Sequence, residues 1–223
     1  MLENVRFHPE EEKQDLEFAK ALVRGFELIV FDAFAQAMRV HASTSGILQL
    51  LPCVSGYLFA KEMRFLSKLL ENPVKPFVVL LGGAKISDRV EVIENLLHRA
   101  DKILIGGALA NTFFKSQGRA VGASLLEDVY VDIAKGEKQN HVQMASLLLK
   151  KGQGVIVLPK DLVAALDENP ASAKIVNLAA GETIPGERWK FLDIGPRTIE
   201  EYSSVLAEAR TVFANGPMGL FEK

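Results

Sequence analysis

Residues 77–90 read Phe-Val-Val-Leu-Leu-Gly-Gly-Ala-Lys-Ile-Ser-Asp-Arg-Val, an apolar run that leads directly into two glycines and a lysine. The apolar run predicts a buried strand, and the residues after it predict a tight turn and the start of a helix. Glycines let a backbone approach a phosphate closely, the first N–H groups of a helix lack partners inside it, and lysine adds a positive charge. The stretch therefore predicts a phosphate site at Gly82, Gly83 and Lys85.

A second turn of the same kind follows at residues 103–111, which read Ile-Leu-Ile-Gly-Gly-Ala-Leu-Ala-Asn. It places Gly106 and Gly107 after another predicted strand. Neither turn matches the lysine loop of P-loop proteins or the GxGxxG fingerprint of dinucleotide-binding folds, and such turns are commonly only tight packing. From these residues alone, both interpretations of the glycines stay open.

Short strand-like runs alternate with longer helical patterns along the chain. We expect strands at 27–30, 77–81, 102–105, 155–158, 174–178 and 211–214, with helices between most of them. Such alternation is typical of an α/β fold with a doubly wound, largely parallel sheet, in which ligands bind at the carboxyl ends of the strands. Both glycine turns fall at such ends.

Two prolines indicate where the chain divides. Pro73 and Pro76 cannot continue the amphipathic helix predicted from Val54 to about Leu70, and they favour extended structure. We predict a smaller piece over residues 1–53, a connecting helix and hinge over 54–76, and a larger α/β domain over 77–223.

Composition excludes several classes of protein. A chain with 48% hydrophobic and 24% charged residues is ordinary for a globular protein, and a net charge of −2 gives no bulk attraction to nucleic acid or anionic lipid. No apolar run reaches the roughly eighteen residues that span a bilayer. The single cysteine, Cys53, has apolar neighbours that predict burial. We expect a cytoplasmic protein without nucleic-acid or membrane partners.

Several motifs, in order along the chain, resemble phosphoglycerate kinase. They are Gly82-Gly-Ala-Lys85 with Ser87-Asp-Arg89, Gly106-Gly-Ala-Leu-Ala-Asn-Thr-Phe113, Leu192-Asp-Ile-Gly-Pro196 and Asn215-Gly-Pro-Met-Gly-Leu-Phe-Glu222. Upstream, Leu2-Glu-Asn-Val-Arg-Phe-His8, Asp32-Ala-Phe34 and Arg39-Val-His-Ala-Ser-Thr44 are similar to the same family. The similarity covers nearly the whole chain. It starts at the family's fourth strand, so we expect an incomplete substrate domain, an interdomain helix and an incomplete, Rossmann-like nucleotide-binding domain.

The resemblance implies a reaction and a set of site residues. In the family, a phosphoryl group passes between 1,3-bisphosphoglycerate and ADP to give 3-phosphoglycerate and ATP, with Mg²⁺ accompanying the nucleotide. The nucleotide-binding residues implied here are Gly82, Gly83, Lys85, Gly106, Gly107, Asn215 and Glu222. Arg39 and Lys75 are implied to bind the substrate, and Arg39 and Arg89 to act in catalysis. No metal ligand is assigned to the chain itself.

Some positions depart from the family pattern. Arg89 stands where the family has a lysine, Lys75 where an arginine is expected, and Phe191 at a place that is glycine in many members, where a ring could narrow an adenine slot or merely pack against it. Arginine and lysine are not equivalent at a crowded phosphate site. Asp32 fits a cap at a strand end as well as a site carboxylate, and structural roles also fit Arg6 and His41.

Two alternatives to the kinase reaction stay open. A catalytically silent fragment would at most bind nucleotide or a partner protein, and strands left without neighbours would favour its self-association. An unrelated dinucleotide-binding module is the weaker alternative, because neither Gly-Gly turn has the third glycine or a clear ribose acid about twenty residues further on.

Overall fold

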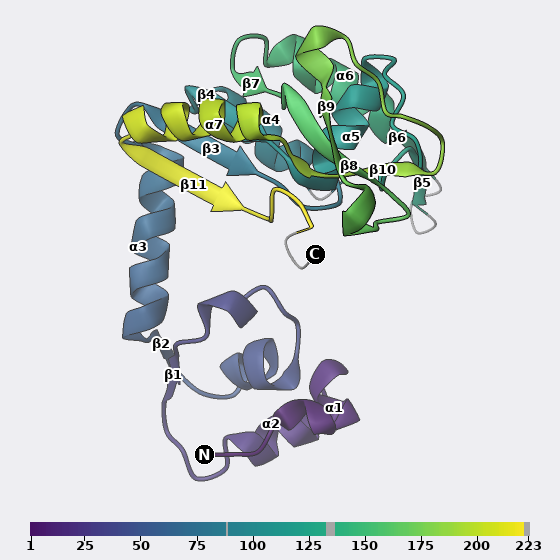
Figure 1. Cartoon of the computed structure of the whole chain (residues 1–223). Helices are drawn as coiled ribbons and strands as arrows, with labels where there is room; N and C mark the ends of the chain where they lie inside the picture. The colour runs from purple at the N-terminus through teal and green to yellow at the C-terminus, as the bar shows by residue number, and fades with distance from the viewer. Residues whose placement is uncertain (88, 133–136, 221–223) are drawn as a thin grey trace. The chain divides into compact units, whose positions relative to one another are not determined.

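The computed structural model describes residues 1–87, 89–132 and 137–220, and it divides the chain into two compact units, Met1–Asn72 and Pro73–Lys223. Figure 1 shows both units coloured along the chain. The boundary lies inside the stretch 54–76 that the prolines predict as a connecting helix and hinge. No helix among the described residues is long and apolar enough to cross a membrane.

The second unit is built on a parallel sheet with the strand order β11-β3-β4-β7. Its strands are β3 (Phe77–Leu81), β4 (Lys102–Ile105), β7 (Ile156–Val157) and β11 (Thr211–Asn215). Four of the five residues of β3 are buried, the pattern of a strand that is covered on both faces. The strand predictions at 77–81 and 102–105 are confirmed to the residue, and those at 155–158 and 211–214 differ from the observed strands only at their ends.

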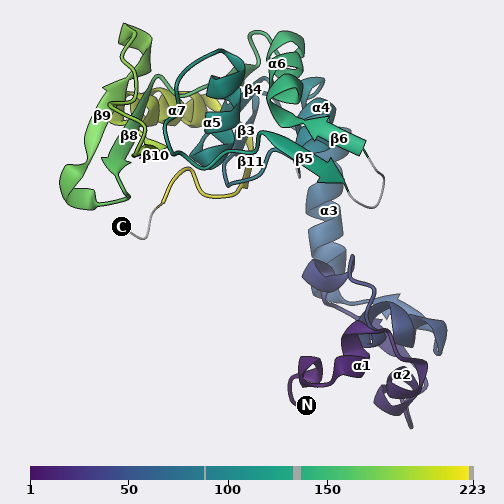
Figure 2. The same ribbon diagram turned by 90° about the vertical axis from the view of Figure 1, so that its right-hand side faces the viewer.

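Helices cover both faces of this sheet, as a doubly wound fold requires. They are α4 (Val90–Leu97), α5 (Gly107–Ser116), α6 (His141–Lys151) and α7 (Pro196–Glu208). On one face, Tyr202 of α7 is buried in a cluster with Val78 of β3 and Leu104 of β4. Figures 1 and 2 show α4 and α6 on the opposite face. The predicted fold class is therefore confirmed.

A separate antiparallel sheet was not foreseen from the sequence. Its strands are β8 (Asp161–Leu166), β9 (Lys174–Asn177) and β10 (Trp189–Ile194), in the order β10-β8-β9. The prediction of a strand at 174–178 is right, but its assignment to a parallel sheet is wrong, because β9 pairs antiparallel with β8. A second antiparallel pair, β5 (Val129–Asp132) with β6 (Glu137–Asn140), was not predicted either.

The first unit contains the helices α1 (Pro9–Glu12), α2 (Leu16–Leu22) and α3 (Tyr57–Glu71) and two parallel strands, β1 (Ile29–Phe31) and β2 (Cys53–Ser55). Short 3₁₀ or π turns lie at Val5–Phe7, Phe34–Gln36, Ala42–Gly46 and Ile47–Gln49, and in the second unit at Pro170–Ser172 and Leu178–Ala180.

Two predictions for the first unit need correction. The long helix starts at Tyr57 and not at Val54, because Val54 belongs to β2. Cys53 was expected to be buried but is exposed, since all three residues of β2 are exposed in this two-stranded sheet.

Candidate functional site

Three glycine-containing turns meet at the carboxyl ends of adjacent strands in the second unit. The last residue of β11, Asn215, pairs with Leu81 of β3, and Leu81 pairs with Ile105 of β4. The residues that follow, Gly216, Gly82 and Gly106, therefore leave the sheet at the same level. This alignment brings together motifs that are far apart in the sequence.

Backbone hydrogen bonds join the three turns. The amide of Gly82 donates to the carbonyl of Asn215 at 3.0 Å, and the amide of Gly83 donates to that of Pro217 at 2.8 Å. The amide of Gly107 donates to the carbonyl of Met218 at 2.6 Å. The amides of Gly82, Gly83 and Gly107 are consequently engaged within the protein.

Close packing of the turns explains why glycine occupies these positions. A Cβ atom on Gly82 would lie 2.0 Å from the carbonyl oxygen of Pro217. Gly107 has a φ of +61°, and a Cβ there would lie 2.8 Å from both the nitrogen of Gly83 and the oxygen of Pro217. No side chain fits at such distances, so glycine at these positions allows the backbones of the turns to pack closely against one another.

The side chains of Arg89 and Asn215 contact each other beside the turn that contains Gly83. The Nη1 group of Arg89 donates a hydrogen bond to Oδ1 of Asn215. The Nη2 atom lies 3.2 Å from the position that a Cβ on Gly83 would take. Three of the predicted site residues, Gly83, Arg89 and Asn215, are thus brought together.

Lys85 is exposed in the loop between β3 and α4, and it has no hydrogen bond or ion pair with any other described residue. The sequence placed it at the start of a helix, but α4 begins at Val90. The dipole of α4 therefore does not act on Lys85, since its effect is confined to the first turn of the helix. The next polar residue, Ser87, is bound to Glu127 and does not cap the helix.

A cavity of about 400 Å³ opens beside these turns. Gly83 and Gly107 form part of its wall, whereas Gly82 and Gly106 are buried and do not line it. Most of the wall is apolar, formed by Ala84, Ala108, Ala123, Leu125, Phe191, Leu192, Pro217 and Leu220. Lys190 and Glu168 also line it and pair at 2.8 Å, a polar contact in a largely apolar wall.

Most of these wall residues were missed from the sequence. Ala123 and Leu125 lie in an irregular segment, and Lys190 lies in the unforeseen strand β10. Phe191, noted as a departure from the family, does line the cavity and is 7% exposed. Glu222, predicted to bind nucleotide, lies outside the described residues.

Lys75 lies away from these turns, before the amino end of β3. Its ammonium group forms an ion pair with Asp101 at 3.2 Å and donates to the carbonyl of Arg99. The amide of Phe77 donates to the same carboxylate at 2.6 Å, which lowers the pKa of Asp101 below its ordinary value. Lys75 thus anchors the start of β3 in this structure, and its substrate role stays a prediction.

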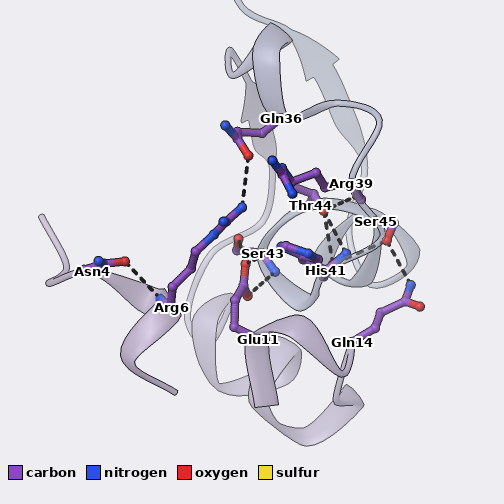
Figure 3. A network of polar contacts seen from close by, with 10 residues as sticks. All are labelled: Asn4, Arg6, Glu11, Gln14, Gln36, Arg39, His41, Ser43, Thr44 and Ser45. Carbon is purple, nitrogen blue, oxygen red and sulfur yellow. Dashed lines mark hydrogen bonds and ion pairs between the residues drawn. The ribbon is translucent and has the colours of Figure 1, made fainter. Parts of the chain in front are cut away.

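The first unit holds a polar network around a smaller cavity of about 190 Å³ (Figure 3). Glu11 is 2% exposed, and its carboxylate accepts hydrogen bonds from the amide of Ser43 at 2.9 Å and from its hydroxyl at 2.5 Å. The Nδ1 atom of His41 lies 3.7 Å from the same carboxylate. Arg6 donates to Oε1 of Gln36 at 3.2 Å across the cavity wall.

Arg39 is exposed, and its guanidinium has no hydrogen bond or ion pair with other described residues. In Figure 3 its side chain extends toward Gln36, the acceptor for Arg6. Asp32 proves to be a cap, because its carboxylate accepts from the amide of Phe59 at 2.8 Å in the first turn of α3. That geometry favours the structural interpretation of Asp32.

Comparisons with known proteins all point to the same protein family. The sequence model described as "Phosphoglycerate kinase" matches residues 1–223. The phosphoglycerate kinase of Chlorobium phaeobacteroides is 47% identical over 223 residues, which cover 100% of this chain and 53% of that protein. The phosphoglycerate kinase of Synechococcus elongatus is 46% identical over 226 residues, with the same shares of 100% and 53%.

Solved structures agree with this result. The phosphoglycerate kinase of Coxiella burnetii gives a TM-score of 0.73 at 36% identity, over 98% of this chain and 54% of that one. The enzyme from Pyrococcus horikoshii gives a TM-score of 0.79 at 30% identity, over 98% and 55%. The chain spans about half the length of the curated relatives that it matches.

Proposed function

Because the chain belongs to the phosphoglycerate kinase family, we propose that it acts in phosphoryl transfer between 1,3-bisphosphoglycerate and ADP, which yields 3-phosphoglycerate and ATP. One observation carries this proposal: Gly83 lines a largely apolar cavity of about 400 Å³, and the guanidinium of Arg89, hydrogen-bonded to Asn215, lies beside Gly83. An apolar cleft with a few polar groups at one edge is typical of a small-molecule site.

The two sides of the site suit the two ends of a nucleotide. Leu125, Phe191 and Leu192 form an apolar wall that suits a flat base. Lys85 and Arg89 supply positive charge beside the glycine turns, where phosphates would lie. Phosphoryl transfer depends mainly on positioning and on cations that neutralise charge on the moving group, so these residues fit its requirements.

The Mg²⁺ in the proposed reaction would arrive bound to the nucleotide. Within residues 1–87, 89–132 and 137–220, no three histidine, cysteine, aspartate or glutamate side chains gather into a metal-binding group. Mg²⁺ keeps several waters and binds readily through substrate phosphates.

Arg39 is our preferred substrate contact in the first unit. Its planar guanidinium can bind a phosphate or carboxylate through two parallel hydrogen bonds, and no other described residue occupies it. Lys75 is the weaker candidate, because its ammonium already pairs with Asp101. We propose 3-phosphoglycerate and ATP or ADP as the small-molecule partners and the cytoplasm as the location.

Nucleotide binding without turnover is a second candidate function. Two of the four predicted cationic site residues are already engaged, Arg89 with Asn215 and Lys75 with Asp101. Such a chain would bind MgADP and leave it unchanged. Self-association through open strand edges belongs to this candidate as a further proposal.

Titration calorimetry with MgADP tests the nucleotide site. We expect Lys85→Ala to weaken binding about tenfold, since a charge-assisted contact to phosphate is lost. The matched control is Lys115→Ala, which removes another exposed lysine of the second unit that lies outside the 400 Å³ cavity. Equal affinities for the original chain and Lys85→Ala would remove Lys85 from the site, and no binding at all would contradict the proposed function.

A further inference from the structure

Residues 123–128, which we call the strap, form an irregular segment that contributes Ala123 and Leu125 to the wall of the cavity. The strap is attached to strand β10. The amide of Ala123 donates to the carbonyl of Trp189 at 2.9 Å, and the amide of Phe191 donates to the hydroxyl of Ser124 at 2.8 Å. The strap is therefore fixed to β10, the strand that carries Phe191, and we call Phe191 with its neighbour Leu192 the aromatic wall of the cavity.

The strap is also attached to helix α5. The side chain of Asn111, which is 1% exposed, donates from Nδ2 to the carbonyl of Leu125 at 2.9 Å. Gly107, the first residue of the same helix, lines the cavity. Two walls of the cavity are thus held by hydrogen bonds to one short segment.

A third attachment reaches the loop that carries the predicted phosphate-binding cations. The carboxylate of Glu127 accepts from the amide of Ser87 at 2.8 Å through one oxygen and from its hydroxyl at 3.0 Å through the other. Ser87 lies two residues after Lys85 and two residues before Arg89. Beside it, Ile86 is fully buried, so Ser87 and Ile86 together anchor a loop whose Lys85 has no hydrogen bond or ion pair with another described residue.

We propose that Glu127 is a positioning residue for nucleotide phosphates, acting through Ser87 on Lys85 and Arg89. The inference rests on the proposed function, because it concerns the same site. A carboxylate that accepts two hydrogen bonds from one serine fixes that serine's backbone in position and direction. Glu127 thereby links the phosphate side of the cavity to the strap, which forms part of the side proposed for the base.

Paired titrations with MgADP and with adenosine test this assignment. Adenosine carries the base and ribose but no phosphate, so it reports only the strap and the aromatic wall. We expect Glu127→Gln and Ser87→Ala each to weaken MgADP binding about tenfold, the effect of one charge-assisted hydrogen bond, and to leave adenosine binding unchanged. Ser87→Thr keeps the hydroxyl and should bind MgADP as the original chain does.

The matched control is Glu94→Gln, which removes the carboxylate of an exposed pair with Lys151 on the helix after the loop. It should leave both affinities unchanged. A tenfold loss for MgADP and adenosine alike would overturn the inference, because it would show a general disturbance of the cavity. Equal MgADP affinity in Glu127→Gln, Ser87→Ala and the control would overturn it as well.

Limited digestion with trypsin gives a readout that does not depend on nucleotide. Trypsin cleaves after lysine and arginine, so it reports the order of the loop at Lys85. We expect Glu127→Gln to raise the cleavage rate there several-fold relative to Glu94→Gln, with the unfolding midpoint unchanged. An unchanged rate contradicts the inference. If the original chain binds neither ligand, the proposed function fails, and the digestion still decides whether Glu127 orders the loop.

Discussion

Gly82 shows at the scale of one residue how the site is built. Its Cβ would meet a backbone oxygen, which cannot rotate away as the end of a side chain can. We expect Gly82→Ala to lower the free energy of unfolding by about 3 kcal/mol, because the turns after β3 and β11 would have to separate. Urea unfolding followed by the fluorescence of the single tryptophan, Trp189, measures this in the second unit.

Gly186→Ala is the control for that measurement. A Cβ on Gly186 would approach only the side chain of Trp189, at 3.5 Å, which is ordinary contact. Its effect should stay within about 0.5 kcal/mol. Equal stability of the two variants would contradict the account of the meshed turns.

Asp101 gives the second unit a predictable response to acid. The hydrogen bond from the Phe77 amide lowers the pKa of Asp101 below its ordinary value, burial opposes this shift, and Lys75 adds to it. A carboxylate with a depressed pKa stabilises the fold above its unfolded pKa, and this contribution is lost as pH falls through the folded pKa. We expect unfolding titrations between pH 7 and pH 2 to show that loss below about pH 4.

Asp101→Asn should remove this part of the acid sensitivity and lower stability at pH 7, because the amide carries no charge. Glu94→Gln is the control, since its exposed pair should contribute little. If Asp101→Asn and the original chain lose stability in parallel below pH 4, the Phe77 contact does not control the titration.

Sequence reasoning identified some residues of the site and not others, for a physical reason. Arg89 and Asn215 were found because each lies in a recognisable motif, and the structure joins them by a hydrogen bond. The placement of Lys85 at the start of a helix was wrong, because α4 begins at Val90 and no side chain at its N-cap position, Arg89, caps it. Ala123 and Leu125 were missed because an apolar wall needs only shape, and many sequences supply it.

At the scale of elements, helix α7 depends on a carboxylate from a neighbouring strand. Asp161 of β8 is fully buried and accepts from the amide of Arg197 at 3.0 Å, the amide of Thr198 at 2.8 Å and the hydroxyl of Thr198 at 2.6 Å. Two orphan amides of the first turn are thereby satisfied by a residue distant in sequence.

Asp161→Ala should therefore lower the free energy of unfolding by about 3 kcal/mol, since it leaves buried donors without partners. Circular dichroism during urea unfolding measures the change. Glu94→Ala removes an exposed carboxylate from α4 and should alter stability by no more than about 0.5 kcal/mol. A loss of similar size in both variants would rule out a capping role for Asp161.

The elements predicted well are those whose burial imposes a clear pattern. Strand β3 is apolar throughout because both of its faces are covered, and its ends were predicted to the residue. Strand β8 reads Asp-Leu-Val-Ala-Ala-Leu, and its alanines and leucines favour helix as much as strand. Its pairing with β9 and β10 is a tertiary effect, which local sequence does not encode.

Turnover requires both ligand sites of the molecule at once. We expect a protein made of these 223 residues alone not to convert 3-phosphoglycerate and MgATP at an enzyme-like rate. Its relatives are about twice as long, and a reaction between two bound ligands needs both held in near-attack geometry. One electrostatic donor contributes on the order of 100-fold in rate, so a protein limited to half the length of these relatives should be slower by many powers of ten.

A coupled assay at high concentration of purified protein measures this rate, and Lys85→Ala serves as the control against contaminating host enzyme. Robust activity that Lys85→Ala abolishes would refute the expectation. It would mean that Arg89 and its neighbours suffice, or that chains complement one another in an oligomer.

The close packing of the three turns limits the kinds of mutation that this part of the chain can accept during evolution. Their contacts run between backbone atoms, so most side chains beside the glycines are free to change without disturbing them. The number of residues between each strand and its turn is constrained. Asn215, Leu81 and Ile105 pair with one another across the sheet, so an insertion or deletion would move one turn out of line with the others. Descendants of this sequence should therefore accumulate substitutions near the cavity far more readily than insertions or deletions.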